Sequence, residues 1–161
     1  MFYRQASDQY IQEGQPFEID GTSYPANWLN CATPEQKTAL GLVEVTYANQ
    51  PENDQFYWVS STLNGSVCTY TNTPKDLTGL KVQWTNQTRQ TAYSMLFPSD
   101  WMVVKATETQ TPVPADWNTY RANVRTTCTN AVAAIDAAVD VPALQVAVQV
   151  TWPKDPNNKD V

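Results

Sequence analysis

The spacing of hydrophobic positions along the chain changes near Thr73-Pro74. Before this point apolar and polar residues alternate, as over 17–20, which is the pattern of β-strands. After it, apolar residues recur every three or four positions, which is the pattern of α-helices. The sequence therefore predicts an α+β protein with a β-rich module over 1–72, a helical hairpin module over 73–153 and a loose tail over 154–161.

Turn and cap residues divide the first module into short elements. Asp20-Gly21 predicts a tight turn between two strands, 17–19 and 22–24. Thr33, Pro34 and Gln36 form a helix-start signal, so we expect a short helix over 34–40 that ends at Gly41. A strand over 43–47 and a polar loop over 48–55 follow. Asn64-Gly65 then predicts a β-hairpin over 56–71 with a type I′ turn, which requires positive φ at both turn residues.

The second module is organised around a long helix over 114–139. Its larger side chains form one stripe, which comprises Trp117, Tyr120, Val124, Cys128, Ala131, Ile135 and Val139. A helix over 74–96, capped by Thr73, carries a matching stripe, so the two are expected to pair as an antiparallel hairpin. Identical helices from neighbouring subunits are the alternative cover. We also expect short helices over 100–107, with Trp101 and Val104 buried, and over 140–148.

Composition narrows the classes of partner. The chain has 161 residues, a net charge of −6 and a pI near 4.4, which disfavours nucleic acid and anionic membranes. The N-terminal residues lack the basic start and apolar run of a signal peptide, and no stretch is long enough for membrane insertion. The three widely spaced cysteines predict buried thiols rather than a disulfide framework.

Candidate chemistry is sparse. The sequence has no histidine, its acidic residues are scattered, and its five glycines form no phosphate-binding loop. Catalytic units built on histidine and imidazole metal sites are therefore excluded. Asp136 and Asp140 lie four apart near a helix end, where solvated surface is the expected role. We expect no enzymatic activity, no cofactor and no metal site.

The aromatic residues point to packing and to partner binding. Four tryptophans are expected to pack in the core, namely Trp28, Trp84, Trp101 and Trp117. Three consecutive aromatics, Phe56, Tyr57 and Trp58, place rings on both faces of one strand, so Tyr57 is expected to face opposite to the other two. The ribbon over 56–71 and the turn from Tyr24 to Leu29 then form the predicted contact surface. Its candidate protein-interaction residues are Trp28, Phe56, Tyr57 and Trp58, whose exposed member would meet a partner chain or a sugar.

Three stretches resemble small proteins encoded beside tail-fibre genes in tailed bacteriophages, including tail assembly chaperones. The first is GQPFEIDGTSYPANWLNCATPEQKTALGLVEV, and the second is LKVQWTNQTRQTAYSMLFPSDWMVVKATET. The third is PADWNTYRANVRT followed by TWPKDP, which is similar to the W-x-x-Y-R…WP ending of those proteins. An Ala-rich helix separates the two parts here, and Val124 and Thr126 stand where that ending has Leu and Asp.

The resemblance implies a non-enzymatic virion component of the baseplate or tail fibre that binds other tail subunits. It implies a place in the virion tail after assembly in the bacterial host cytoplasm, with tail fibre or baseplate subunits as partners and self-association left open. One alternative is a tail or tail-fibre assembly chaperone that is absent from the mature particle. A second alternative is a carbohydrate-binding tail module.

Overall fold

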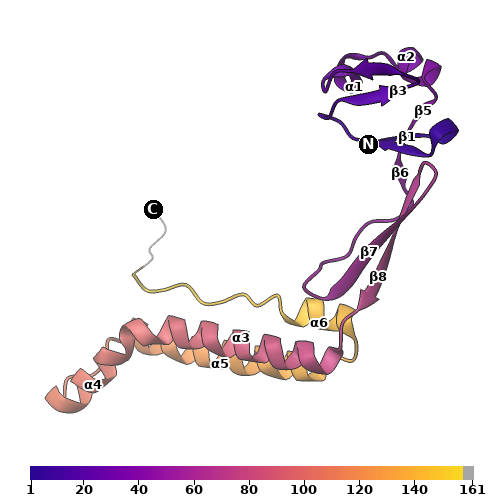
Figure 1. Cartoon of the computed structure of the whole chain (residues 1–161). Helices are drawn as coiled ribbons and strands as arrows, with labels where there is room; N and C mark the ends of the chain where they lie inside the picture. Colours follow the sequence, from indigo (N-terminus) through magenta and orange to yellow (C-terminus); the bar gives the residue numbers. More distant parts are fainter. Residues whose placement is uncertain (158–161) are drawn as a thin grey trace. The chain divides into compact units, whose positions relative to one another are not determined.

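The computed structural model describes residues 1–157 and has the expected α+β organisation, with strands in the N-terminal half and helices in the C-terminal half (Figure 1). The chain divides into two compact units, Met1–Thr73 and Pro74–Val161. Below, these are called the β unit and the helical unit.

The β unit contains a three-stranded antiparallel sheet in the order β2-β1-β5. Its strands are β1 (Phe2–Arg4), β2 (Gln9–Ile11) and β5 (Leu42–Glu44), and the 3₁₀ turn η1 (Gln5–Ser7) connects the first two. The sequence analysis did not predict β1 and β2, because no turn signal such as Asp20-Gly21 lies between these two short strands.

A second pair of strands follows the predicted hairpin. Strand β3 (Phe17–Ile19) pairs antiparallel with β4 (Thr22–Tyr24). Both turn residues have positive φ, 50° at Asp20 and 78° at Gly21, as the Asp-Gly signal predicted. Glycine tolerates this conformation without steric cost, and aspartate is among the few other residues that adopt it.

The short helices of the β unit are α1 (Trp28–Cys31) and α2 (Pro34–Ala39). Helix α2 starts with the predicted capping box. The backbone N–H of Gln36 donates to Thr33 Oγ1 at 3.3 Å, and Gln36 Oε1 accepts from the Thr33 N–H at 2.8 Å. Two donors that a helix start leaves without partners are thereby satisfied. The helix is followed by Gly41 at a φ of 69°.

Apolar residues from these elements form the core of the β unit. The buried members are Phe2, Ile11, Ile19, Leu29 and Leu42. Leu29 is 1% exposed. The rings of Phe17, Tyr24 and Trp28 pack against this group, with Phe17 and Tyr24 stacked at 5.0 Å and Trp28 edge-on to both.

The rest of the β unit is a ribbon of three strands in the order β6-β8-β7. They are β6 (Thr46–Tyr47), β7 (Tyr57–Asn64) and β8 (Val67–Pro74), and β6 runs parallel to β8. The hairpin was predicted, but its turn was placed one residue too early. Gly65 and Ser66 form the loop, with positive φ at Gly65 (57°) and not at Asn64. Glycine at the first loop position is typical of a type II′ turn rather than type I′.

The helical unit is built on two long helices, α3 (Leu77–Leu96) and α5 (Ala115–Ala137), which pack side by side as the predicted hairpin (Figure 1). The turn η2 (Phe97–Ser99) and helix α4 (Asp100–Thr109) connect them. Helix α6 (Val141–Ala147) packs on α5, and the Asp140 side chain caps it through the Ala143 N–H at 2.8 Å.

Three details of the helical unit correct the sequence predictions. Helix α3 begins at Leu77 rather than at Pro74, because the Asp76 carboxylate accepts from the Gly79 N–H at 2.6 Å while Thr73 and Pro74 still belong to β8. Trp101 and Val104 are each 57% exposed instead of buried. Val139 is 83% exposed, because α5 ends at Ala137 and the next residue is extended.

The cysteines also differ from their prediction. Cys68 is buried and Cys128 is half-buried, but Cys31 is exposed at the end of α1. All three are free thiols.

Candidate protein-interaction surfaces

A buried arginine holds the connection between the two long helices. Arg121 of α5 is only 5% exposed. Its guanidinium donates to Asp100 Oδ1 at 2.7 Å, to the Leu96 carbonyl oxygen at 2.9 Å and to Ser99 Oγ. A guanidinium has several N–H donors in a fixed plane, which allows one side chain to satisfy acceptors on successive residues of a bend. Arg121 therefore fixes how α3 turns through η2 into α4.

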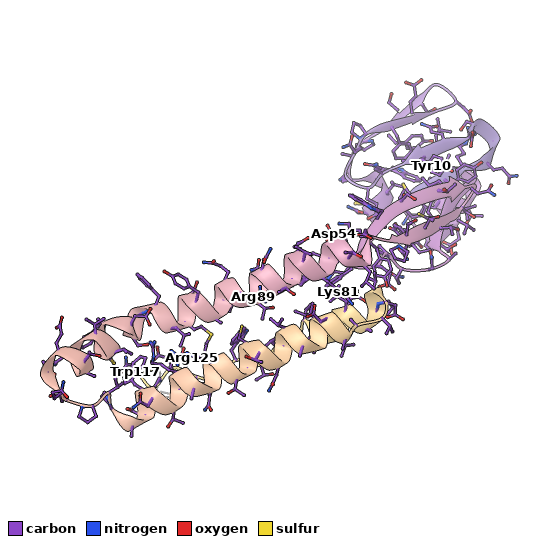
Figure 2. The ribbon with its side chains drawn as sticks, turned by 90° about the horizontal axis from the view of Figure 1, so that it is seen from below. Tyr10, Asp54, Lys81, Arg89, Trp117 and Arg125 are labelled. Atoms are coloured by element: carbon purple, nitrogen blue, oxygen red, sulfur yellow. The ribbon has the colours of Figure 1, made fainter. Side chains whose placement is uncertain are left out.

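The same end of the hairpin holds one apolar cluster of the helical unit, marked by the Trp117 label in Figure 2. Trp117 and Tyr120 are buried and meet edge to face at 5.7 Å. Trp152, far along the chain, packs against this group. Burial, and secondarily the Asp155 carboxylate, raises the pKa of the Tyr120 phenol. Its oxygen lies 3.5 Å from the Met95 carbonyl oxygen.

The opposite side of α3 and α4 is apolar and open to solvent. Tyr93, Phe97, Trp101 and Val104 are between 56% and 61% exposed, and we call them the outer stripe. Tyr93 and Phe97 are one turn apart where α3 ends, and Trp101 and Val104 are about one turn apart in α4. The Tyr93 and Phe97 rings are 5.7 Å apart, and Lys105 Nζ lies 5.8 Å from the Trp101 ring. Large contiguous apolar patches on the surface of a soluble protein mark interaction sites.

A small hollow adjoins the outer stripe. It measures about 170 Å³ and lies between α4 and the connection that leads to α5. Trp101, Met102 and Val113 line it, with Lys105 beside them. The hollow is large enough for one apolar side chain, and the ammonium group beside it favours a carboxylate.

In the β unit, side-chain amides close one edge of the ribbon. Asn49 binds both backbone groups of Tyr70, because its Nδ2 donates to the Tyr70 carbonyl and its Oδ1 accepts from the Tyr70 N–H, both at 2.7 Å. Asn72 similarly contacts the backbone of Gln50 and Glu52. The predicted polar loop 48–55 thus extends the pairing of β6 along β8, which leaves β7 as the outer strand of the long hairpin.

Strand β7 has the composition of an open edge. Its sequence, YWVSSTLN, contains no charged residue and no proline. Natural sheets usually protect an edge with such residues. Trp58 is 67% exposed on this strand and shares its side with the exposed Ser60 and Thr62.

The four predicted interaction residues differ in how far their side chains are exposed to solvent. Trp28 lies in the ring cluster of the core, while Phe56 and Tyr57 are both buried at 3% and 8% exposure. The expected alternation fails at Phe56 because this residue precedes β7 and does not follow the pleat. Trp58 alone presents its ring to solvent, so it remains the candidate contact.

Sequence reasoning missed Arg121 and the outer stripe. Arg121 entered the sequence analysis only as part of the W-x-x-Y-R motif, and no structural role was assigned to it. The outer stripe contains the residues Trp101 and Val104, which helical spacing assigned to the core. A layer of two helices has two sides. The helical spacing of apolar residues alone does not show which of these sides another part of the protein covers.

The described residues offer no metal site. Over residues 1–157, no group of three or more acidic, cysteine or histidine side chains is placed to hold an ion. None of the helices in the same range combines the length and hydrophobicity that a bilayer crossing requires. Comparison of the chain with protein-family models, with curated proteins and with solved structures finds no match.

Proposed function

We propose that this chain is a non-enzymatic bacteriophage tail protein, a small component of the baseplate or tail fibre that binds other tail subunits in the virion. One observation carries the proposal. Residues from separate resembling stretches, Asp100 in one and Trp117, Tyr120, Arg121 and Trp152 in the other, meet at one end of the helical unit. The second and third of the stretches similar to tail proteins therefore lie in one folded module, the helical unit.

Strand β7 is the surface proposed for a tail subunit. An outer strand without charge or proline is suited to accept a strand from another chain, because backbone hydrogen bonds supply affinity and side-chain contacts supply specificity. Trp58 would be the aromatic anchor of that contact, since exposed tryptophans often dominate the energy of an interface.

Mass spectrometry of purified particles tests the proposal. We expect the chain at a fixed copy number relative to the other tail proteins. Its absence from particles, together with abundance in infected lysate, would contradict a virion component and favour the second candidate.

The second candidate is a tail or tail-fibre assembly chaperone, and the position of Trp152 favours it. The Ala-rich part of α5 and helix α6 separate the W-x-x-Y-R stretch from Trp152-Pro153 in the sequence. Trp152 nevertheless packs on the cluster around Trp117 and Tyr120. The helical residues inserted between the two parts therefore do not prevent Trp152 from contacting the W-x-x-Y-R stretch. This contact is compatible with the ending seen in tail assembly chaperones.

A co-assembly assay locates the contact. Trp58→Ala should weaken capture of tail subunits by at least tenfold while the protein stays folded, because the ring lies mostly in solvent. Val82→Ala is the control, since Val82 is an exposed apolar residue of the helical unit outside the outer stripe. If Trp58→Ala assembles as well as the parent, the contact lies elsewhere on the molecule.

A further inference from the structure

The side chains of the outer stripe do not belong to the apolar cluster at this end of the helical unit. On the other side of α3 and α4, Ala92, Met95, Leu96 and Met102 pack against the cluster of Trp117, Tyr120 and Val124. The core is therefore closed without Tyr93, Phe97, Trp101 or Val104, which each keep more than half of their surface in water. Their exposure has to be explained by something outside this helical pair.

We propose that the outer stripe binds a second copy of this chain, with the α3–η2–α4 segments of two copies packed antiparallel about a two-fold axis that passes between Phe97 and Trp101. The proposal is independent of the tail function, because it concerns only how this chain associates with itself.

The exposed area is appropriate for such an interface. An aromatic side chain contributes about 150–250 Å² when it is buried. Three rings that are 56–61% exposed then offer roughly 250–450 Å² per copy by the same scale. A stable interface buries about 800 Å² on each partner, with an apolar centre and a polar rim. The outer stripe supplies that centre, and the polar residues around it supply the rim.

The charges beside the outer stripe are self-complementary. Arg89 lies one helical turn before Tyr93, and Glu108 lies one turn after Val104. An antiparallel two-fold axis between Phe97 and Trp101 brings Arg89 of one copy toward Glu108 of the other. Tyr93 then faces Lys105 of the second copy, where an ammonium group and a ring attract each other, and Phe97 faces Trp101. A parallel arrangement would instead place like charges opposite each other.

The contact is centred where the two segments join. Helix α4 continues from α3 after the turn η2 (Figure 1), so Phe97 and Trp101 lie nearest the axis. These rings should therefore carry most of the affinity, whereas Arg89 and Glu108 should set the antiparallel register.

Sedimentation velocity of the full chain over about 5 to 200 µM tests the proposal. The 18.0 kDa chain should form a reversible dimer. Phe97→Glu combined with Trp101→Glu should raise the dissociation constant at least tenfold, and far-UV circular dichroism should stay unchanged because both rings are exposed. Trp58→Glu, an equally exposed ring in the β unit, is the control and should leave the dimer intact.

A charge exchange tests the register. Arg89→Glu alone should weaken the dimer, and Arg89→Glu with Glu108→Arg should restore it. A monomer throughout the range, a trimer, or a dimer that persists in the Phe97 and Trp101 double variant would each overturn the proposal. Failure of the exchange to restore binding would overturn the two-fold antiparallel arrangement. None of these results depends on whether the chain is found in phage particles.

Discussion

The β unit and the helical unit differ in where one group of neighbouring aromatic residues lies. In the β unit the rings of Phe17, Tyr24 and Trp28 pack on one another and on the core. In the helical unit a comparable set, the outer stripe, lies on the surface. A sheet with helices and a hairpin folded over it encloses its rings, whereas a pair of helices has one inner side and leaves the other uncovered. Exposed rings are therefore expected where the architecture has fewer layers.

The two units also differ in charge. The β unit has eight acidic and two basic residues, so it accounts for the whole net charge of −6. The helical unit has eight of each. Because like charges repel, two copies of the β unit would resist approach, and two copies of the helical unit would not. The neutral unit, which carries the outer stripe, is thus the better candidate for self-association.

The largest expected effect is on the core of the helical unit. Trp117→Ala should lower the free energy of unfolding by about 3–5 kcal/mol, because it removes a buried ring that contacts Tyr120. Hydrogen exchange should show the loss of protection in α3 and α5, with the β1–β2–β5 sheet retained. An unchanged denaturant midpoint would show that the ring contributes little to this core.

The matched experiment in the β unit is Leu29→Ala. Leu29 is 1% exposed, so we expect a loss of about 2–5 kcal/mol. Here protection should be lost in the strands around α1 and retained in α3 and α5. If either substitution removed protection equally from both units, the units would unfold as one cooperative body, and the comparison between them would not hold for stability.

The smallest of the three expected losses of stability concerns the connection from α3 through η2 into α4, which Arg121 holds. Arg121→Lys keeps the charge but not the planar set of donors, so acceptors on Leu96, Ser99 and Asp100 lose partners. We expect about 1–3 kcal/mol of destabilisation, the range for leaving a buried polar group unsatisfied. Thermal unfolding monitored by circular dichroism measures it. A melting curve equal to the parent would mean that lysine supports the bend as well as arginine does.

The sequence predicted most of the elements because local signals specified them. The capping box at Thr33, the Asp20-Gly21 turn and the stripes of α3 and α5 depend on neighbours three or four residues away, and the structure has all of them. In the sheet formed by β1, β2 and β5, strand β1 pairs with β5 across some forty residues, which local spacing does not reveal.

The candidate surfaces were harder to predict for a related reason. Helical spacing identifies an apolar side chain but not which side of a helix another element covers, and Trp101 was assigned to the core for that reason. Likewise, the run of Phe56, Tyr57 and Trp58 showed that one ring would be exposed, but only the position where β7 begins shows that it is Trp58.

The Asn49 side chain has a consequence for how the ribbon behaves over time. Its amide imitates a peptide group, since one atom donates to Tyr70 and another accepts from it. Deamidation would replace the donor nitrogen by an oxygen, and that oxygen would then face the Tyr70 carbonyl oxygen and repel it. A one-atom change would loosen the loop along β8 and give the ribbon a second open edge. Deamidation of Asn49 would therefore change the number of open edges of this ribbon from one to two.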